Sequence, residues 1–81
     1  MMKYKIKAFG IVKEIVGGKE VVVELQDDIK VADLLMAMQA KYPGLRPLNA
    51  LFVAVNREYA DNGKVVTEKD EIALIPPVSG G

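Results

Sequence analysis

The clearest chemical potential in this sequence lies in its last six residues, which are Pro76, Pro77, Val78, Ser79, Gly80 and Gly81. Two prolines stiffen an extended chain, and a segment of this length reaches at most ~20 Å. The final two positions carry no side chain, so they fit a tunnel too narrow for a Cβ. A terminal carboxylate is inert until it forms a mixed anhydride with AMP, after which a sulfur donor can convert it to a thiocarboxylate. The tail therefore predicts a carrier, although a frayed terminus would also end in small residues.

The composition excludes most chemistry that the chain could perform alone. Cysteine and histidine are absent, which removes thiolate nucleophiles, zinc–thiolate sites and the usual base near neutral pH. We therefore expect no metal site and no independent catalysis. Eleven basic residues balance eleven acidic ones, so neither nucleic acid nor a membrane is expected as a partner. No apolar run approaches the ~20 residues of a membrane span, and the N-terminus lacks a signal core, which predicts a cytoplasmic protein.

Three other motifs resemble parts of functional sites but are better explained as turns or a helix start. Residues 17–19 read Gly-Gly-Lys but lack the rest of a phosphate-binding loop, so they predict a turn. Residues 61–63 read Asp-Asn-Gly without the later calcium ligands, which favours a hairpin turn. The two aspartates at 27–28 fit a helix start better than a catalytic carboxylate pair.

The first half of the chain predicts two strands and a helix. Tyr4, Ile6 and Ala8 alternate with polar residues in a strand, and Phe9 then points to the opposite face. Residues 11–16 form either a helical turn or an irregular link. Residues 20–25 form a second strand, antiparallel to the first.

A helix follows, with an apolar stripe at helical spacing that comprises Val31, Leu34, Leu35, Met38 and Tyr42. Its N-terminus is weakly signalled, because Lys30 stands where a capping Ser, Thr or Asp would be expected. Proline and glycine at 43–44 end it.

The second half predicts three more strands. The continuous apolar run 51–55 predicts a central strand covered on both faces. A short exposed strand follows at 57–60, and a last strand at 71–75 ends at the two prolines. We therefore predict an α+β fold, a β-grasp (ubiquitin-like) roll whose mixed sheet of about five strands carries one main helix on one face. Residues 1–75 form this domain, and 76–81 form a flexible C-terminal Gly-Gly tail.

With these features in place, the sequence resembles the ubiquitin-like family of small, sulfur-carrying subunits of molybdopterin synthase over nearly its whole length. The strongest elements are KEIVG at 13–17, VAVN at 53–56 and DEIALIPPVSGG at 70–81. A Gly-Gly end alone would indicate only a ubiquitin-like or sulfur-carrier protein. The proline pair before it is closer to this family than to the thiamin-pathway carrier.

The resemblance implies a sequence of partners for Gly81. An E1-like adenylyltransferase would use ATP and Mg²⁺ to adenylate it, and a sulfurtransferase would supply the sulfur of the thiocarboxylate, so this chain itself would bind no cofactor. The tail would then enter the large synthase subunit, which supplies the catalysis, and give sulfur to cyclic pyranopterin monophosphate. The product is molybdopterin, for a molybdenum or tungsten cofactor. Two carriers would flank a dimer of large subunits in a heterotetramer.

The resemblance also implies an interface with the large subunit. Phe9 occupies the place of an aromatic contact residue, although it would equally cover the far edge of the core. Lys13 stands where relatives often have Arg, and Ile75 where they frequently have Phe. Tyr59 would be a rim contact, although an ordinary amphipathic surface residue explains it better.

Three alternatives to this function stay open. A ubiquitin-like modifier would join Gly81 to lysines of other proteins and leave an isopeptide remnant on them. A carrier for thiamin or cysteine synthesis would copurify with a different acceptor enzyme. A noncovalent β-grasp module would keep its function without Gly80 and Gly81, whereas every carrier would lose it.

Overall fold

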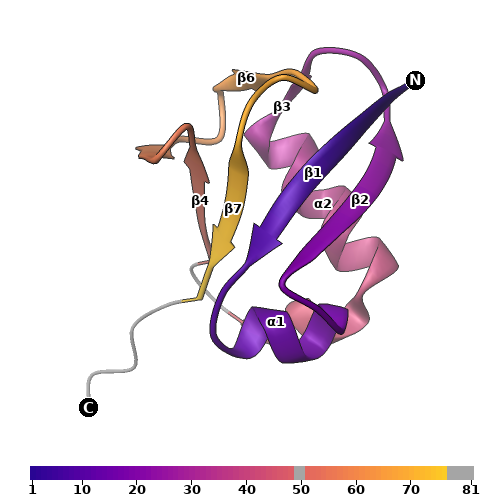
Figure 1. Cartoon of the computed structure of the whole chain (residues 1–81), viewed down its shortest axis with the longest axis vertical. Coiled ribbons are helices and arrows are strands. Elements are labelled where there is room, and N and C mark those ends of the chain that lie inside the picture. Colours follow the sequence, from indigo (N-terminus) through magenta and orange to yellow (C-terminus); the bar gives the residue numbers. More distant parts are fainter. Residues whose placement is uncertain (49–50, 77–81) are drawn as a thin grey trace.

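The structure, a computed structural model, describes residues 1–48 and 51–76 (Figure 1). Its elements in chain order are β1 Met2–Ala8, α1 Ile11–Val16, β2 Glu20–Leu25, β3 Ile29–Lys30, α2 Val31–Lys41, the 3₁₀ turn η1 Pro43–Leu45, β4 Phe52–Val55, β5 Glu58–Ala60, β6 Val65–Val66 and β7 Ile72–Ile75.

The main sheet has five strands in the order β2-β1-β7-β4-β5. β1 and β7 are parallel, whereas β1–β2, β4–β7 and β4–β5 are antiparallel. α2 lies across one face of this sheet, and α1 lies near the end of β1 (Figure 1). The predicted mixed sheet with one main helix on one face is confirmed.

The core lies between the sheet and α2, and the period-two pattern decides which strand residues enter it. Tyr4 and Ile6 of β1 are fully buried against Leu34 and Met38 of α2. The Tyr4 hydroxyl donates a hydrogen bond to the Gln26 carbonyl oxygen at 2.7 Å, so its polar atom is satisfied inside the core.

The segment between β1 and β2 is a short helix, which settles the alternative left open by the sequence. α1 ends at Gly17, whose φ of 84° is left-handed and suits a glycine. The amides of Gly17 and Gly18 both donate to the Lys13 carbonyl oxygen, at 3.0 and 3.1 Å. The Gly-Gly-Lys motif therefore belongs to a helix-ending turn, as predicted.

A distant loop caps the N-terminus of α2. In the described part of the chain, Lys30 makes no side-chain cap hydrogen bond. Instead the Val31 amide donates to the Lys64 carbonyl oxygen at 2.8 Å, and the Ala32 amide to that of Asn62 at 3.1 Å. This loop is brought there by the antiparallel pairing of β3 with β6, a second small sheet that the sequence analysis did not predict.

The prediction that residues 51–55 are covered on both faces is wrong. Val53 and Val55 enter the core, whereas Phe52 on the opposite side of β4 is 46% exposed. The run is continuously apolar because its outward side chains belong to an apolar surface of the sheet, not to a second layer of core.

Candidate functional site

The predicted tail begins at the end of a central strand. β7 has β1 on one side and β4 on the other, and Pro76 follows directly after it. Pro77, Val78, Ser79, Gly80 and Gly81 lie outside the described residues. The predicted tail and its reactive terminus therefore stay predictions, and the structure describes the surface from which they continue.

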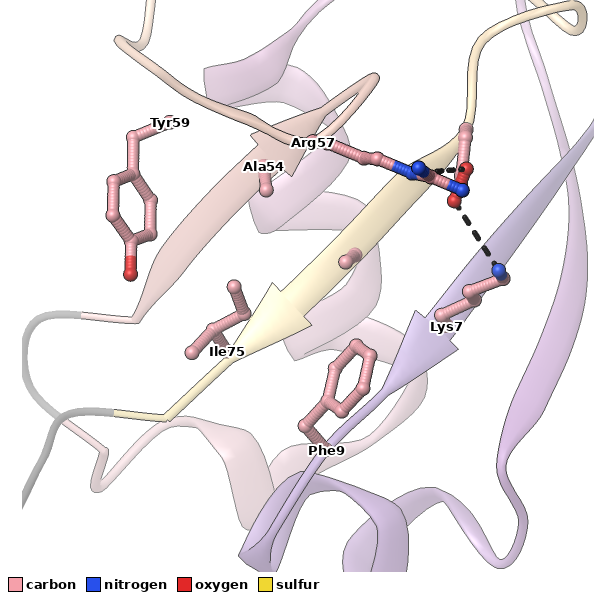
Figure 2. A pocket seen from close by; sticks show the side chains of 8 residues that line it. Lys7, Phe9, Ala54, Arg57, Tyr59 and Ile75 are labelled. Carbon is pink, nitrogen blue, oxygen red and sulfur yellow. Dashed lines mark hydrogen bonds and ion pairs between the residues drawn. The ribbon is translucent and has the colours of Figure 1, made fainter.

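The sheet face away from α2, here called the open face, contains a shallow hollow of about 440 Å³ (Figure 2). Side chains from the four strands β1, β4, β5 and β7 and the segments that adjoin them line it, namely Lys7, Phe9, Ala54, Arg57, Tyr59, Glu71, Ala73 and Ile75.

Three of the four predicted interface residues line this hollow. Phe9 is 49% exposed and Tyr59 is 74% exposed, while Ile75 is half-buried between them. Figure 2 shows the Phe9 ring and the Ile75 side chain on the same face, where the neighbouring strands β1 and β7 end. The outward direction predicted for Phe9 is confirmed.

The parallel register explains how Phe9 reaches Ile75. Ala8 is the register partner of Leu74, and both side chains are buried. The next residue on each chain therefore points to the opposite side of the sheet, because successive side chains of a strand alternate. Phe9 and Ile75 thus meet on the open face, although 65 positions separate them in the sequence.

The fourth predicted residue, Lys13, lies beside this surface. It lines a second hollow of about 460 Å³, together with Phe9 and Lys7, which also line the first. Lys19 and Glu20 complete the charged lining of this second hollow. The two hollows form one surface, with an apolar centre and lysines at its margin.

A carboxylate shared by two cations marks the other end of the open face. Lys7 Nζ lies 3.2 Å from Glu71 Oε2, and Arg57 Nε lies 3.9 Å from Glu71 Oε1. These side chains are largely exposed, so each ion pair contributes little to stability. Their arrangement leaves one positive charge in excess at the edge of the hollow (Figure 2).

Sequence reasoning missed Phe52, Arg57 and Glu71. The Phe52 ring packs on that of Tyr59, with centroids 5.5 Å apart and planes at 51°. The available signal for Phe52 was the period of β4, which places it on the face opposite Val53 and Val55. Nothing local marks Arg57 or Glu71, because they meet only through the pairing of strands.

Arg57 occupies a strained backbone position. It and Asn56 form the two-residue turn between β4 and β5, with φ of 70° and 53°. Positive φ at both central positions is typical of a type I′ hairpin turn, which strongly prefers glycine at the second. Strain of this kind is concentrated at functional sites.

We expect Arg57→Gly to raise the free energy of unfolding by about 0.5 kcal/mol, since the relief of left-handed strain exceeds the added chain entropy. Urea denaturation measures this. Asn56→Gly is the contrasting variant and should destabilise, because Asn56 makes side-chain hydrogen bonds that glycine lacks. A loss of stability in Arg57→Gly would show that its contacts outweigh the strain.

Asn56 ties this hairpin to the turn that precedes β7. Its Nδ2 donates to Asp70 Oδ1 at 2.9 Å, and its Oδ1 accepts from the Glu71 amide at 2.9 Å. Asp70 Oδ2 in turn accepts from the Thr67 amide at 2.8 Å. The hydrogen bond from the backbone amide of Thr67, followed by that from the side-chain amide of Asn56, stabilises the ionised carboxylate and lowers the pKa of Asp70 below its ordinary value.

The lowered pKa of Asp70 predicts a contribution to acid unfolding. The folded state favours the carboxylate, so the stabilisation is present above the unfolded pKa of about 3.9 and is lost as pH falls through the lower folded value. Asp70→Asn should cost about 1 kcal/mol near neutral pH, and this deficit should shrink below about pH 4. Urea denaturation from pH 7 to pH 3 measures it. Glu68→Gln, in the same turn, is the control and should follow the wild type.

Residues 1–48 and 51–76 contain no group of three or more His, Cys, Asp and Glu side chains placed to hold a metal ion. Their helices include none with the length and hydropathy to span a bilayer.

Several known proteins resemble this chain over nearly its whole length. The molybdopterin synthase sulfur carrier subunit of Dictyostelium discoideum is 36% identical over 83 residues, which cover 98% of this chain and 96% of that protein. The crystal structure of SAMP1 from Haloferax volcanii, a small archaeal modifier protein, superposes with a TM-score of 0.81 at 32% identity and covers 98% of this chain and 99% of that one.

A third similarity is to a chain in the complex of subunits 1 and 2 of molybdopterin-converting factor from Helicobacter pylori 26695. Its TM-score is 0.67 at 27% identity, with 99% of this chain and 100% of that chain covered. These structural neighbours confirm the predicted β-grasp, ubiquitin-like fold. The model of the ThiS family matches residues 6–81. This protein therefore belongs to the ThiS family.

Proposed function

We propose that this protein is the sulfur-carrier subunit of a molybdopterin synthase. The observation that carries the proposal is the position of Pro76, where the tail begins. Ile75 lines the hollow of the open face, and the next residue, Pro76, begins the segment that ends in Gly81. A partner seated on this face would therefore receive the tail. The relative from Dictyostelium discoideum, which bears this function in its name, supports the proposal over almost the full chain.

The proposed chemistry takes place at the Gly81 carboxylate. A carboxylate oxygen attacks the α-phosphorus of ATP, pyrophosphate leaves, and the acyl adenylate forms. Sulfur at the oxidation level of sulfide, delivered by a sulfurtransferase, then attacks the acyl carbon and AMP leaves. The sulfur of the resulting thiocarboxylate bonds to a carbon of cyclic pyranopterin monophosphate, and water then cleaves the bond between that sulfur and the acyl carbon, which leaves the sulfur on the pterin and returns Gly81 as a carboxylate. Since activation consumes ATP, the proposed site of action is the cytoplasm.

The catalysis in this scheme belongs to the partners. The chain has no Cys or His, and its contribution is to present the tail and to dock. An E1-like adenylyltransferase, with ATP and Mg²⁺, would activate Gly81. The large synthase subunit would accept the sulfur, in a heterotetramer of two subunits of each kind. The complex of subunits 1 and 2 from Helicobacter pylori supports a large-subunit partner.

The open face has the character of a protein-binding surface. Its centre holds Phe9, Ile75 and Tyr59, and aromatic residues in partly exposed apolar surfaces are typical binding anchors. The cations at its margin are Lys7, Lys13, Lys19 and Arg57, against the carboxylates Glu20 and Glu71. This excess of positive charge fits a partner whose contact surface is apolar at its centre and acidic at its rim.

Mass spectrometry of the C-terminal peptide tests the proposal. The protein is incubated with its E1-like enzyme, ATP, Mg²⁺ and a sulfur source, and is then digested with trypsin. Replacing oxygen by sulfur changes the mass almost as methionine oxidation does. Cleavage after Lys69 releases residues 70–81, which contain none of the four methionines of the chain. A gain of that mass on this peptide therefore reports sulfur alone.

The outcomes separate the proposal from its rivals. Sulfur confined to the C-terminal peptide, followed by molybdopterin formation with the large subunit, is the expected result. A thiocarboxylate that only a thiamin or cysteine pathway enzyme accepts would identify another carrier. If the peptide stays unmodified while a known carrier reacts in the same mixture, a noncovalent module replaces the carrier.

A second candidate function is protein modification. It is favoured by the similarity to the small archaeal modifier protein of Haloferax volcanii, at 32% identity over 98% of this chain. Such a modifier would leave residues 70–81 branched from lysines of other proteins after tryptic digestion. Expression of the tagged protein in its native cell, with a search for that branched peptide, would detect this function independently of sulfur transfer.

A further inference from the structure

We propose that the Pro76 ring packs against the Cα of Gly10, which has no side chain, and that this contact, here called the seat, positions the tail for the reactions of Gly81. The inference rests on the proposed function and adds to it a positioning pair within this chain. It is carried by the register of two strands, by the backbone conformation of Gly10 and by the space around it.

The register brings the two residues together. β1 and β7 run parallel, and Ala8 is the partner of Leu74. Two positions farther along each chain stand Gly10 and Pro76, where both strands have ended. Pro76 has no amide hydrogen, so it cannot donate to the sheet and extend the ladder. Packing of its ring is therefore the contact by which Pro76 can be positioned beside Gly10.

Only glycine suits the position opposite that ring. Gly10 has φ 56° and ψ −134°, a conformation that residues with a side chain rarely adopt. A Cβ built on it would lie 2.9 Å from Pro76 Cγ and 3.8 Å from Cδ. The first distance is well below the ~3.5–4.0 Å of favourable carbon contacts. A side chain at this position would strain the backbone and also displace the ring.

The seat itself is firmly attached to the core. The first turn of α1 begins at Gly10, where the Val12 amide donates to the Phe9 carbonyl oxygen and the Lys13 amide to that of Gly10, both at 3.1 Å. Val12 is fully buried. Gly10 therefore moves with the core, and the ring that rests on it gives the tail a defined starting point.

The seat also links the tail to the open face. The residues that precede Gly10 and Pro76 are Phe9 and Ile75, and both line the hollow (Figure 2). A partner that binds Phe9 and Ile75 thus finds Pro76, where the tail begins, at a fixed position relative to these two side chains. Because small misplacements of a reacting group cost large factors in rate, this position matters for transfer even though the seat does not touch the reacting atoms.

Steady-state kinetics of the adenylation step test the proposal, with the full-length protein as the varied substrate of its E1-like enzyme and pyrophosphate release as the signal. Gly10→Ala should lower kcat by about tenfold or more, through the displaced tail, and leave KM unchanged because every side chain that lines the two hollows is retained. Gly17→Ala is the matched control. Gly17 also has positive φ, at 84°, but its Cβ would meet no atom of the described residues within 4 Å. It should keep the wild-type kcat.

A double variant shows whether Gly10 acts through Pro76. Pro76→Ala removes the ring and should itself lower kcat, because the tail loses its seat. In that background Gly10→Ala should have no further effect on kcat, since the clashing atom is gone. Additive losses would overturn the proposed mechanism, and so would wild-type kcat in folded Gly10→Ala or an equal loss in Gly17→Ala.

A partner-free measurement separates this inference from the proposed function. If the wild-type protein is never adenylated, the proposed function fails, but the seat is still tested by NMR of the protein alone. Nuclear Overhauser contacts between the Gly10 Hα atoms and the Pro76 ring are expected in the wild type and in Gly17→Ala. Their absence from the wild type would overturn the seat.

Discussion

Deletion of Gly80 and Gly81 is expected to abolish thiocarboxylate formation and sulfur transfer while leaving the free energy of unfolding unchanged. The deletion removes the proposed reacting carboxylate and shortens the segment that carries it. The buried core of the described residues extends from Tyr4 to Leu74 and does not depend on these glycines. Sulfur on the C-terminal tryptic peptide and molybdopterin yield measure activity, and urea denaturation measures stability.

Gly81→Ala is the matched variant for this deletion. It keeps a terminal carboxylate and the tail length, and adds one Cβ at the narrowest point of the proposed tunnel. We expect impaired activation or transfer with unchanged stability. Full turnover by the deletion variant would exclude every carrier function and favour a noncovalent module, whereas full turnover by Gly81→Ala would refute only the narrow tunnel.

The second large effect is expected at the open face. Phe9→Asp should raise the Kd for the large synthase subunit by about 100-fold or more, because it removes an aromatic anchor and places a charge in a surface that becomes desolvated. Isothermal titration calorimetry with the purified large subunit measures it. Phe9 is 49% exposed and lies outside the fully buried core, so the free protein should stay folded.

Val22→Asp is the control for this substitution. Val22 is 46% exposed, close to the value for Phe9, and lies on the same side of the sheet in β2, but it is not part of the hollow. Its variant should bind the large subunit as the wild type does. Equal weakening by both substitutions would mean that the partner covers the whole sheet, and normal binding of Phe9→Asp would place the interface elsewhere.

Local patterns were sufficient to predict the strands of the main sheet and the main helix, and they are the basis of the tail prediction. The alternation around Tyr4 and Ile6 predicted β1, and the helical spacing from Val31 to Met38 predicted α2, because burial on one face imposes the period of each structure on its sequence. The Pro-Pro-Val-Ser-Gly-Gly ending carried the chemical prediction without any tertiary information. All of this ending after Pro76 lies beyond the described residues, so the carrier chemistry still depends on the sequence, the family and the proposed experiments.

Pairings between distant segments were beyond the reach of these patterns. The caps of α2 come from Asn62 and Lys64, and the β3–β6 pairing places them there, although no local rule links those residues to Val31. The apolar run 51–55 was misjudged for a related reason. A side chain buried in a core and one reserved for a partner have the same hydrophobicity, so composition alone cannot distinguish a covered face from an open one.

The sequence by itself thus determined the fold class and predicted the tail, because each leaves a periodic or compositional signal within a short window, and the family resemblance added Phe9, Tyr59 and Ile75 of the open face. The tertiary structure alone decided that Phe9 lies beside Ile75, that Arg57 and Lys7 share Glu71, and that Gly10 seats Pro76. The physical reason is the parallel pairing of the first and last strands. It places β1 beside β7 within the sheet, so that the residues that follow each strand lie close together through contacts that no short stretch of sequence specifies.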